Sequence, residues 1–170
     1  MSPDNARLEA AIDRIRFSRR FTERFLADLA PQDWFWCPTE VTTHIAWQVA
    51  HVAVAQYNLC LRRVRGRTIE DEKLMPDSFI DAFKLGSKPV VDPAQNPSLS
   101  EIQRVFAAVY ERALAELAGR TVAELDVPLE QPHPAFDTKM RAIEFCSQHE
   151  LVHAGQIALL RRLMGRPPLR

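Results

Sequence analysis

The segment Ile45–Leu61, which reads IAWQVAHVAVAQYNLCL, places the strongest constraint on how this chain folds. No glycine or proline interrupts the sequence from about Thr42 to Val64, and IAWQVAHVAVAQYNLCL is apolar on nearly every side of a helix. A helix that is apolar all round must be covered by neighbours on more than one face. The sequence therefore predicts a central helix surrounded by other helices.

Three further segments have the apolar spacing of long helices. They run from about Asn5 to Leu29, from Ser98 or Ser100 to Gly119, and from about Thr138 to Met164. Serine is a favoured N-cap, and glycine or proline commonly follows the last turn of a helix. No alternating apolar run is long enough to predict a sheet.

The connections between these helices differ in length. Residues 66–97 are rich in Pro, Asp, Ser and Lys, and only PDSFIDAFKLG is periodic, which predicts a long crossover containing one short helix. The segment RTVAELDVPLEQPHPAFDT is interpreted as a connector. Four long helices with a long second connection predict an all-α four-helix bundle, and residues 1–170 are the length of one domain.

Charge and cysteine content exclude several classes of protein. Lys and Arg together number 22, as do Asp and Glu, so no net field attracts nucleic acid or an anionic membrane. The densest basic patch, RRVRGR at Arg62–Arg67, is interpreted as a solvated helix end. Met1 is not followed by the apolar stretch of a signal peptide, and no run approaches the length of about 18 apolar residues needed to span a membrane. The three cysteines, Cys37, Cys60 and Cys146, form no C-x-x-C pair, which favours a reducing compartment; we expect a cytoplasmic protein without a disulfide framework.

The last helix contains HELVH, in which His149 and His153 are one turn apart. This is the pattern that holds zinc in a class of metalloproteases, with the glutamate as general base. Catalytic zinc usually takes three protein ligands. No His, Cys, Asp or Glu follows His153, and no sheet is predicted. Both observations disfavour a protease.

At about 100° per residue, Cys146 and Gln156 share one stripe of the helix with the two histidines. The stripe continues through apolar positions at Leu160 and Met164, so we expect it to face the core. Glu150 falls on the flank of the stripe, where it could approach the site but not head on.

The third candidate ligand is His51, which lies among apolar residues in the middle of the central helix. Burying an imidazole without a partner costs a few kcal/mol. A metal shared with His149 and His153 would supply the partner, and a core histidine bonded to a backbone carbonyl is the alternative. We favour the metal because three such rings need an explanation at once.

The two other histidines have different predicted roles. His44 lies about 10 Å further along the helix than His51, too far for the same ion, and is interpreted as a helix-start residue near Thr43. His133 is interpreted as a loop residue that could line the entrance to the site.

The segment IAWQVAHVA, followed much later by QHELVHAGQIALLRRLMGRPP, resembles the DinB-like (YfiT-like) superfamily of small helical metalloenzymes. The resemblance covers nearly the whole chain and includes the tryptophan-containing entry to the second helix, DWFWCPTEVTTHIAW, although members often have a Ser or Thr cap where His44 stands here. It implies that His51, His149 and His153 bind a divalent metal such as Zn, Ni or Fe, with Gln156 as the accompanying glutamine.

By the same resemblance, some relatives are transferases and isomerases that use a low-molecular-weight thiol such as bacillithiol or mycothiol. A three-histidine metal with open positions lowers the pKa of a bound thiol or water. We therefore expect a metal-dependent transferase or hydrolase acting on a small-molecule substrate, with a thiol as cosubstrate. Glu150 is the candidate proton acceptor, or orients His153, and a solvent-facing or structural role is the alternative.

Several neighbours of the candidate ligands could belong to the site. Cys146 could be a fourth ligand or a wall of the pocket, and we favour the wall because a free cysteine is commonly a core residue. Trp47, Tyr57 and Asn58 lie within a turn or two of His51 and could line a pocket or belong to the core.

Two other classes of metal-binding helical bundle are alternatives. A di-iron carboxylate bundle needs Glu-x-x-His on two helices, and among the four predicted helices only the last has that spacing, from Glu150 to His153. A non-enzymatic metal-binding or stress-associated bundle is the stronger alternative. A fourth protein ligand closing the metal would favour this alternative, whereas an open position would favour an enzyme.

The apolar surface of the second helix also suggests that the chain binds a second copy of itself. Because that helix is apolar on nearly every side, we expect a homodimer packed through the first and second helices.

Overall fold

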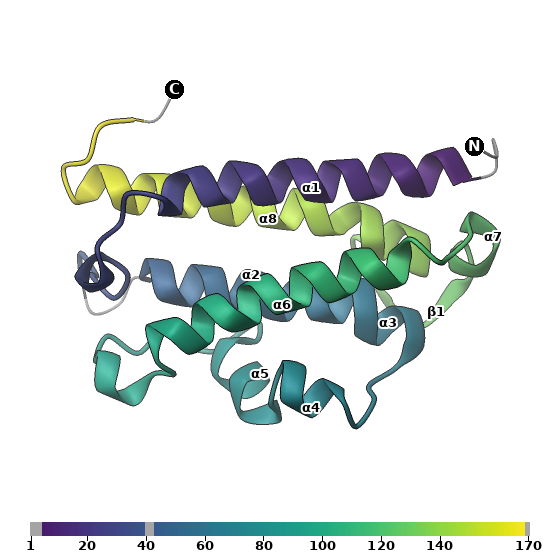
Figure 1. Ribbon diagram of the computed structural model, residues 1–170, viewed down its shortest axis with the longest axis horizontal. Helices are drawn as coiled ribbons and strands as arrows, with labels where there is room; N and C mark the ends of the chain where they lie inside the picture. Colours follow the sequence, from purple (N-terminus) through teal and green to yellow (C-terminus); the bar gives the residue numbers. More distant parts are fainter. Residues whose placement is uncertain (1–4, 40–42, 169–170) are drawn as a thin grey trace.

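The computed structural model describes residues 5–39 and 43–168, and most of them are helical. The four long helices are α1 (Ala6–Leu26), α2 (Ile45–Tyr57), α6 (Leu99–Leu117) and α8 (Lys139–Leu163), which confirms the predicted all-α bundle (Figure 1). The expected start of the second helix at Thr42 lies outside the described residues. No helix in the described part of the chain is both long and apolar enough to cross a membrane.

Side-chain caps fix where the helices begin. The hydroxyls of Ser98 and Thr138 each accept a hydrogen bond from the backbone amide three residues later, at 3.2 Å. At the start of α2 the imidazole Nδ1 of His44 accepts from the amide of Trp47 at 3.1 Å, which confirms that His44 is a helix-start residue. Beyond α8, Gly165 has a φ of +83°, a conformation that only glycine adopts readily.

Contacts between distant residues give the helix directions. Arg7 bonds Glu144 near the start of α1 and α8, and Arg161 bonds the carbonyl of Phe25 near their ends, so these two helices are parallel. In Figure 1, α2 and α6 run together in the opposite direction. The order is therefore up, down, down, up, and the two parallel central helices need the long crossover between them.

The central helix is longer than α2 alone. It continues without a break as a π-helix, η3 (Asn58–Arg62), and one last turn, α3 (Arg63–Arg65), before the chain turns at Gly66. Within α2 every residue except Trp47 and Ala55 is buried. The prediction of a central, enclosed helix is confirmed.

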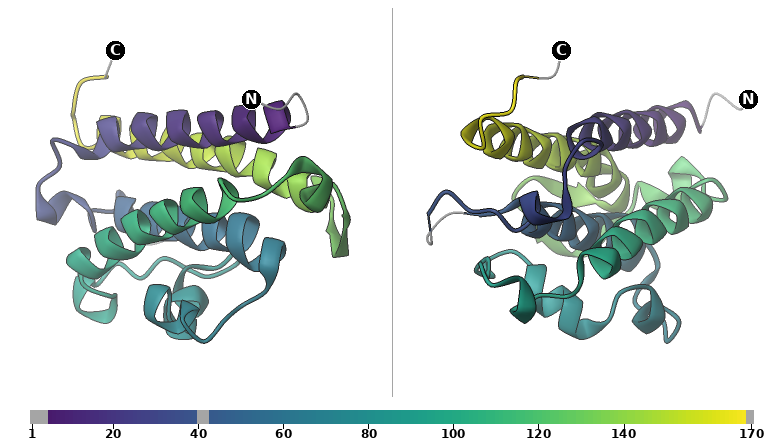
Figure 2. Two further views of the ribbon diagram at one scale, coloured as in Figure 1. Left: turned by 45° about the vertical axis from the view of Figure 1, so that its right-hand side comes forward. Right: turned by 60° about the vertical axis from the view of Figure 1, so that its left-hand side comes forward.

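The crossover covers the outer side of α2 and α6 (Figure 2). It contains α4 (Asp71–Leu74), α5 (Asp77–Phe83) and the short 3-10 turn η4 (Pro93–Gln95), one helix more than predicted. Apolar side chains of this region, including Met75 and Phe79, are buried. The apolar surface of α2, which suggested a dimer, is therefore covered within one chain.

Asp71 ties the crossover to the central helix. Its carboxylate accepts hydrogen bonds from Tyr57 Oη at 3.0 Å, from both terminal nitrogens of Arg65 at 2.8 and 2.9 Å, and from the amide of Thr68 at 2.9 Å. The Arg65 guanidinium holds the pKa of Asp71 well below its usual range. Tyr57 is thus a core residue, and Arg65, which also bonds Glu116, is not the solvated side chain expected in the basic patch.

The connector before α8 contains structure that the sequence analysis did not predict. A short helix, α7 (Val122–Leu125), is followed by an antiparallel hairpin of β1 (Pro128–His133) and β2 (Phe136–Thr138). The expectation of no sheet was wrong here, because prolines interrupt the alternation that marks a strand. His133 lies at the end of β1 rather than in a loop, and its ring stacks on the buried Phe136 with centroids 4.4 Å apart.

A buried arginine joins all four long helices. Arg19 of α1 is 1% exposed and donates to Glu150 Oε1 of α8 at 2.9 Å, to Gln56 Oε1 of α2 at 2.9 Å and to the carbonyl of Phe106 of α6 at 2.8 Å. Its guanidinium carbon also lies 3.4 Å from the centre of the Phe106 ring. Glu150 is itself 1% exposed.

Removing one partner of this ion pair leaves the other buried without an opposite charge. We expect Arg19→Met to lower the free energy of unfolding by about 3 to 5 kcal/mol, because a buried carboxylate loses its counter-ion. The double variant Arg19→Met/Glu150→Leu should recover most of that loss, since neither charge remains. Urea denaturation of both variants measures the difference. Arg16→Met, which removes an exposed arginine from the same helix, should cost less than about 1 kcal/mol; a similar cost for Arg16→Met and Arg19→Met would contradict the expectation.

Candidate metal centre

Three histidines from two helices converge at one point of the bundle. His51 comes from the middle of α2, and His149 and His153 come from successive turns of α8. One ring nitrogen from each residue can be chosen so that all three lie within 4.8 Å of one another. The structure therefore brings together the three residues that the sequence analysis selected as metal ligands.

Hydrogen bonds at the far side of two rings fix their tautomers. The Nδ1 atom of His51 lies 2.7 Å from the carbonyl oxygen of Phe83, and Nδ1 of His153 lies 2.5 Å from Oε1 of Gln48. Because these oxygens only accept, Nδ1 carries the proton in both rings and Nε2 keeps a free lone pair. The amide nitrogen of Gln48 donates to Thr43 Oγ1 at 3.0 Å, which holds its oxygen toward His153.

The alternative for His51, a core histidine bonded to a carbonyl, describes only half of the ring. Its Nδ1 does bond a carbonyl, but its Nε2 keeps a lone pair, and the ring also has a nitrogen within 4.8 Å of nitrogens of the other two histidines. This is the arrangement in which a second group orients a metal-binding imidazole.

The local environment keeps the three rings neutral. Burial, and then the neighbouring His51, lower the pKa of His149 to about 4. Burial, followed by the proximity of His149 and His51, lowers the pKa of His153 to about 3. Burial also lowers the pKa of His51, against the opposing bond to Phe83. Neutral imidazoles are the form that binds metals, and no proton need be displaced at neutral pH.

The spacing of two of the donor atoms fits a divalent ion. The Nε2 atoms of His149 and His153 lie 3.2 Å apart. Two nitrogens bound to one tetrahedral zinc ion lie about 3.3 Å apart, given Zn–N bonds of about 2.05 Å. Three imidazoles suit Zn, Ni, Fe or Cu, and no fourth His, Cys, Asp or Glu joins the group in the described part of the chain.

The buried face of α8 is centred differently from the prediction. At about 100° per residue the buried Ala154, Ile157 and Arg161 cluster around the direction of Glu150, which lies at the centre of this face. His149 and His153 lie at its edge and are only half-buried. Glu150 does lie on the flank of the histidine stripe, but this flank, and not the stripe, is the centre of the buried face, because Arg19 of another helix supplies the partner that a buried carboxylate needs.

Gln156 does not share the buried surface of the stripe. Its side chain is exposed, whereas Leu160, further along the stripe, is buried. The expectation that Gln156 faces the core was therefore wrong. Its part in the site stays a prediction.

Cys146 is buried beside Cys60 of η3 and stands outside the histidine group. A hydrogen bond with Cys60, followed by burial, raises the pKa of the Cys146 thiol well above its usual value. A thiol that stays protonated is a poor metal ligand. These contacts favour the pocket-wall interpretation over a fourth ligand.

Trp47 and Asn58 lie in different surroundings. The indole of Trp47 stacks on His51 with centroids 4.7 Å apart, and its Nε1 donates to Ser87 Oγ of the crossover at 3.2 Å. It therefore covers one face of a candidate ligand. Asn58 begins the π-helix and lines a groove at the other end of the central helix.

Sequence reasoning missed three groups at this centre: Gln48, the Phe83 carbonyl and the ring of Phe145, whose centroid is 6.1 Å from that of His149. Gln48 carried a usable signal, since it is a polar residue one turn before His51 in an apolar helix. The other two depend on the path of the crossover and on the rotation of α8.

The three histidines should determine metal content together. Purified without chelators, the wild type should contain about one divalent ion per chain by elemental analysis, and His51→Ala, His149→Ala and His153→Ala should each lose most of it, since two protein ligands rarely hold an ion. His133→Ala, outside the group, should keep the wild-type content. Full retention of metal by His51→Ala would show that the ligand set is wrong.

Gln48 should tune metal affinity without being a ligand. Gln48→Leu removes the acceptor that orients His153, and we expect affinity to fall by about 10- to 100-fold with unchanged stoichiometry at saturating metal. Competition with a metal-binding dye measures this change. Gln103→Leu, at an exposed position of α6, is the matched control; equal affinities for the two variants would argue against the orienting role.

Comparison with known proteins supports the same grouping. Residues 14–157 match the family model described as the DinB superfamily, a range that includes the three histidines and all four long helices in whole or in large part. A search of curated proteins returned no match. Because the family model matches most of its length, the chain belongs to the DinB superfamily.

Proposed function

We propose that this protein is a divalent-metal-dependent transferase that uses a low-molecular-weight thiol as cosubstrate and acts on a small-molecule substrate. The observation that carries the proposal is a group of three histidines that no fourth His, Cys, Asp or Glu of the described residues completes. Structural metal sites are usually closed by four protein ligands, whereas catalytic sites keep a position open.

The position of the group suits a site that small molecules reach. His149 and His153 lie at the edge of the buried face of α8 and are half-buried rather than enclosed. Trp47 and Phe145 place aromatic rings beside His51 and His149, which would cover the apolar part of a bound molecule.

The residues of the chain orient and shield the centre. The Phe83 carbonyl and Gln48 hold two imidazoles with Nε2 free, and the stacked ring of Trp47 excludes water from one face of His51. A divalent ion held by these nitrogens would supply a Lewis acid that lowers the pKa of a thiol or water beside it.

The surroundings favour a thiol over water as the activated group. Glu150, the candidate proton acceptor, is held by Arg19 in the core, so we assign it a structural role. No Asp or Glu of the described residues joins the histidine group, so activation depends on how far the pKa of the bound group must fall. A thiol starts near about 8.5 and water near about 15.7, so a thiol needs the smaller shift. Hydrolysis is therefore the second candidate reaction.

Two further expectations belong to the proposal. The buried cysteines Cys60 and Cys146 are free thiols, which fits a reducing compartment, so we keep the prediction of a cytoplasmic protein. The homodimer also stays a prediction, now without the apolar surface of α2 as its argument.

Binding of thiols can be tested by thermal unfolding of the metal-loaded protein. We expect bacillithiol, mycothiol or glutathione at about 100 times its Kd to stabilise the protein by about 2.7 kcal/mol, which raises the Tm by about 5 to 10 °C. The S-methylated form of the same thiol should give no shift, because its sulfur cannot be deprotonated.

The metal-loaded wild type is compared with His51→Ala, which is expected to hold little metal. A shift in the wild type alone supports activation at the three-histidine centre. Equal shifts in both proteins would place the thiol elsewhere, and no shift with any thiol would favour the hydrolase or a non-enzymatic metal-binding bundle.

A further inference from the structure

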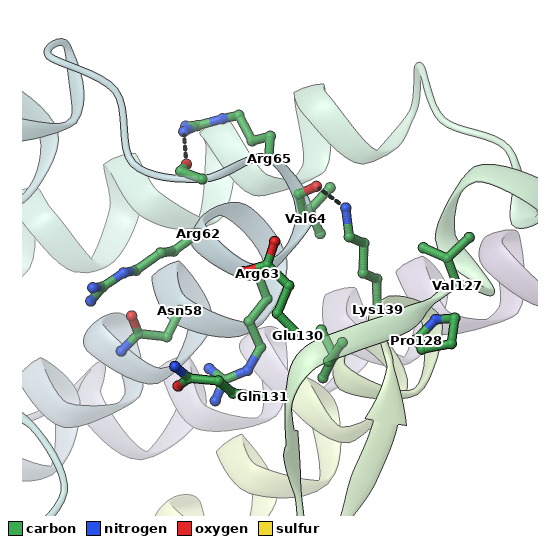
Figure 3. Close-up of a pocket in the computed structure, with 12 residues that line it drawn as sticks. Asn58, Arg62, Arg63, Val64, Arg65, Val127, Pro128, Glu130, Gln131 and Lys139 are labelled. Atoms are coloured by element: carbon green, nitrogen blue, oxygen red, sulfur yellow. Dashed lines mark hydrogen bonds between the residues drawn. The ribbon is translucent and has the colours of Figure 1, made fainter.

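A second feature with binding chemistry lies at the other end of the central helix. A groove of about 910 Å³ opens between the η3 and α3 turns and the hairpin (Figure 3). Its polar lining includes Asn58, Arg62, Arg63, Glu130, Gln131 and Lys139. None of the three clustered histidines lines it.

The charge of this groove is unbalanced. Arg65 at its rim is neutralised by Asp71 and Glu116, and Lys139 Nζ donates to the carbonyl of Val64 at 2.8 Å. Among the described residues, neither Arg62 nor Arg63 has a carboxylate within ion-pair distance. Glu130 is the one acidic residue of the lining.

Arg63 is the most informative of these side chains. It is half-buried, and its guanidinium carbon lies 5.3 Å from the centre of the buried Phe136 ring. Burial, and then the charge of Arg62, lower the pKa of Arg63. Holding a guanidinium partly out of water beside another one costs free energy that a bound anion would offset.

The backbone at this point is also unusual. Asn58 and Arg62 are the first and last residues of a π-helical turn, which is rare and occurs frequently at functional sites. Figure 3 shows the side chains of both residues extending to the same side of the groove, with Arg63 directed toward Gln131 of the hairpin. Two guanidinium groups and two amides thus border one open space.

We propose that this groove binds a small molecule carrying carboxylate or phosphate groups, with Arg62 and Arg63 as the charged contacts and Asn58 and Gln131 as neutral hydrogen-bonding groups. Arginine forks match the paired oxygens of both kinds of anion. The rings of Phe136 and Phe145 lie between Arg63 and His149, so this site is separate from the histidine group and does not depend on the function proposed for it.

Calorimetric titration of the metal-free protein with inorganic phosphate and with succinate tests the proposal. At low ionic strength the wild type should bind at least one of them, and the tighter of the two identifies the anionic group. Arg63→Met, which keeps the apolar stem, and the exposed Arg62→Met should each weaken binding at least tenfold. Neutral succinamide should not bind.

Two controls make the outcome decisive. Arg104→Met removes the same charge from the exposed side of α6 and should change the affinity less than twofold. His51→Ala should bind the anion like the wild type, even if the metal centre has no catalytic function. Equal weakening by Arg104→Met, loss of binding in His51→Ala, equal binding of succinamide, or no binding of either anion would each overturn the proposal.

Discussion

The buried contact between Arg19 and Glu150 is the interaction on which the rest of this bundle depends. One guanidinium reaches a carboxylate, an amide and a backbone carbonyl, each on a different helix, while its own stem belongs to the fourth. Two of its neighbours remain incompletely bonded, since Glu150 Oε2 and Gln56 Nε2 have no hydrogen-bond partner in the described part of the chain. Such a contact adds little net stability. Any arrangement of the helices that buried one of these charges without the other would, however, be strongly disfavoured.

The contact also determines which way α8 faces. With Glu150 directed at Arg19, the preceding residue His149 and the following turn at His153 are rotated to the edge of the core, where His51 of α2 meets them. The position of the candidate metal centre therefore follows from a charge pair that has no part in its chemistry. This also explains why the glutamate of HELVH, which would be the base in a protease, is unavailable here.

The sequence predicted most of what depends on local pattern. Apolar periodicity located the four helices, and the unusual polarity of His51 within an apolar helix led to the residue that the structure places beside His149 and His153. It did not predict features set by contacts between distant segments. The central place of Glu150 required Arg19, and the orientation of His51 required a carbonyl from the crossover at Phe83. The hairpin was missed because its strands are short and prolines interrupt the alternation that marks a strand.

The π-helical turn has a consequence for how the chain can vary. A wide turn holds one residue more than an α-helical turn, so the residues after it are displaced around the axis by about 100° relative to an uninterrupted helix. His51 lies before this turn, and Arg62 and Arg63 lie at or after its end. Loss of a single residue within this turn would restore an α-helical turn, and the residues after it would keep nearly the same direction. One continuous helix can therefore gain or lose a residue between His51 and Arg63 while each keeps its place on the surface of the helix.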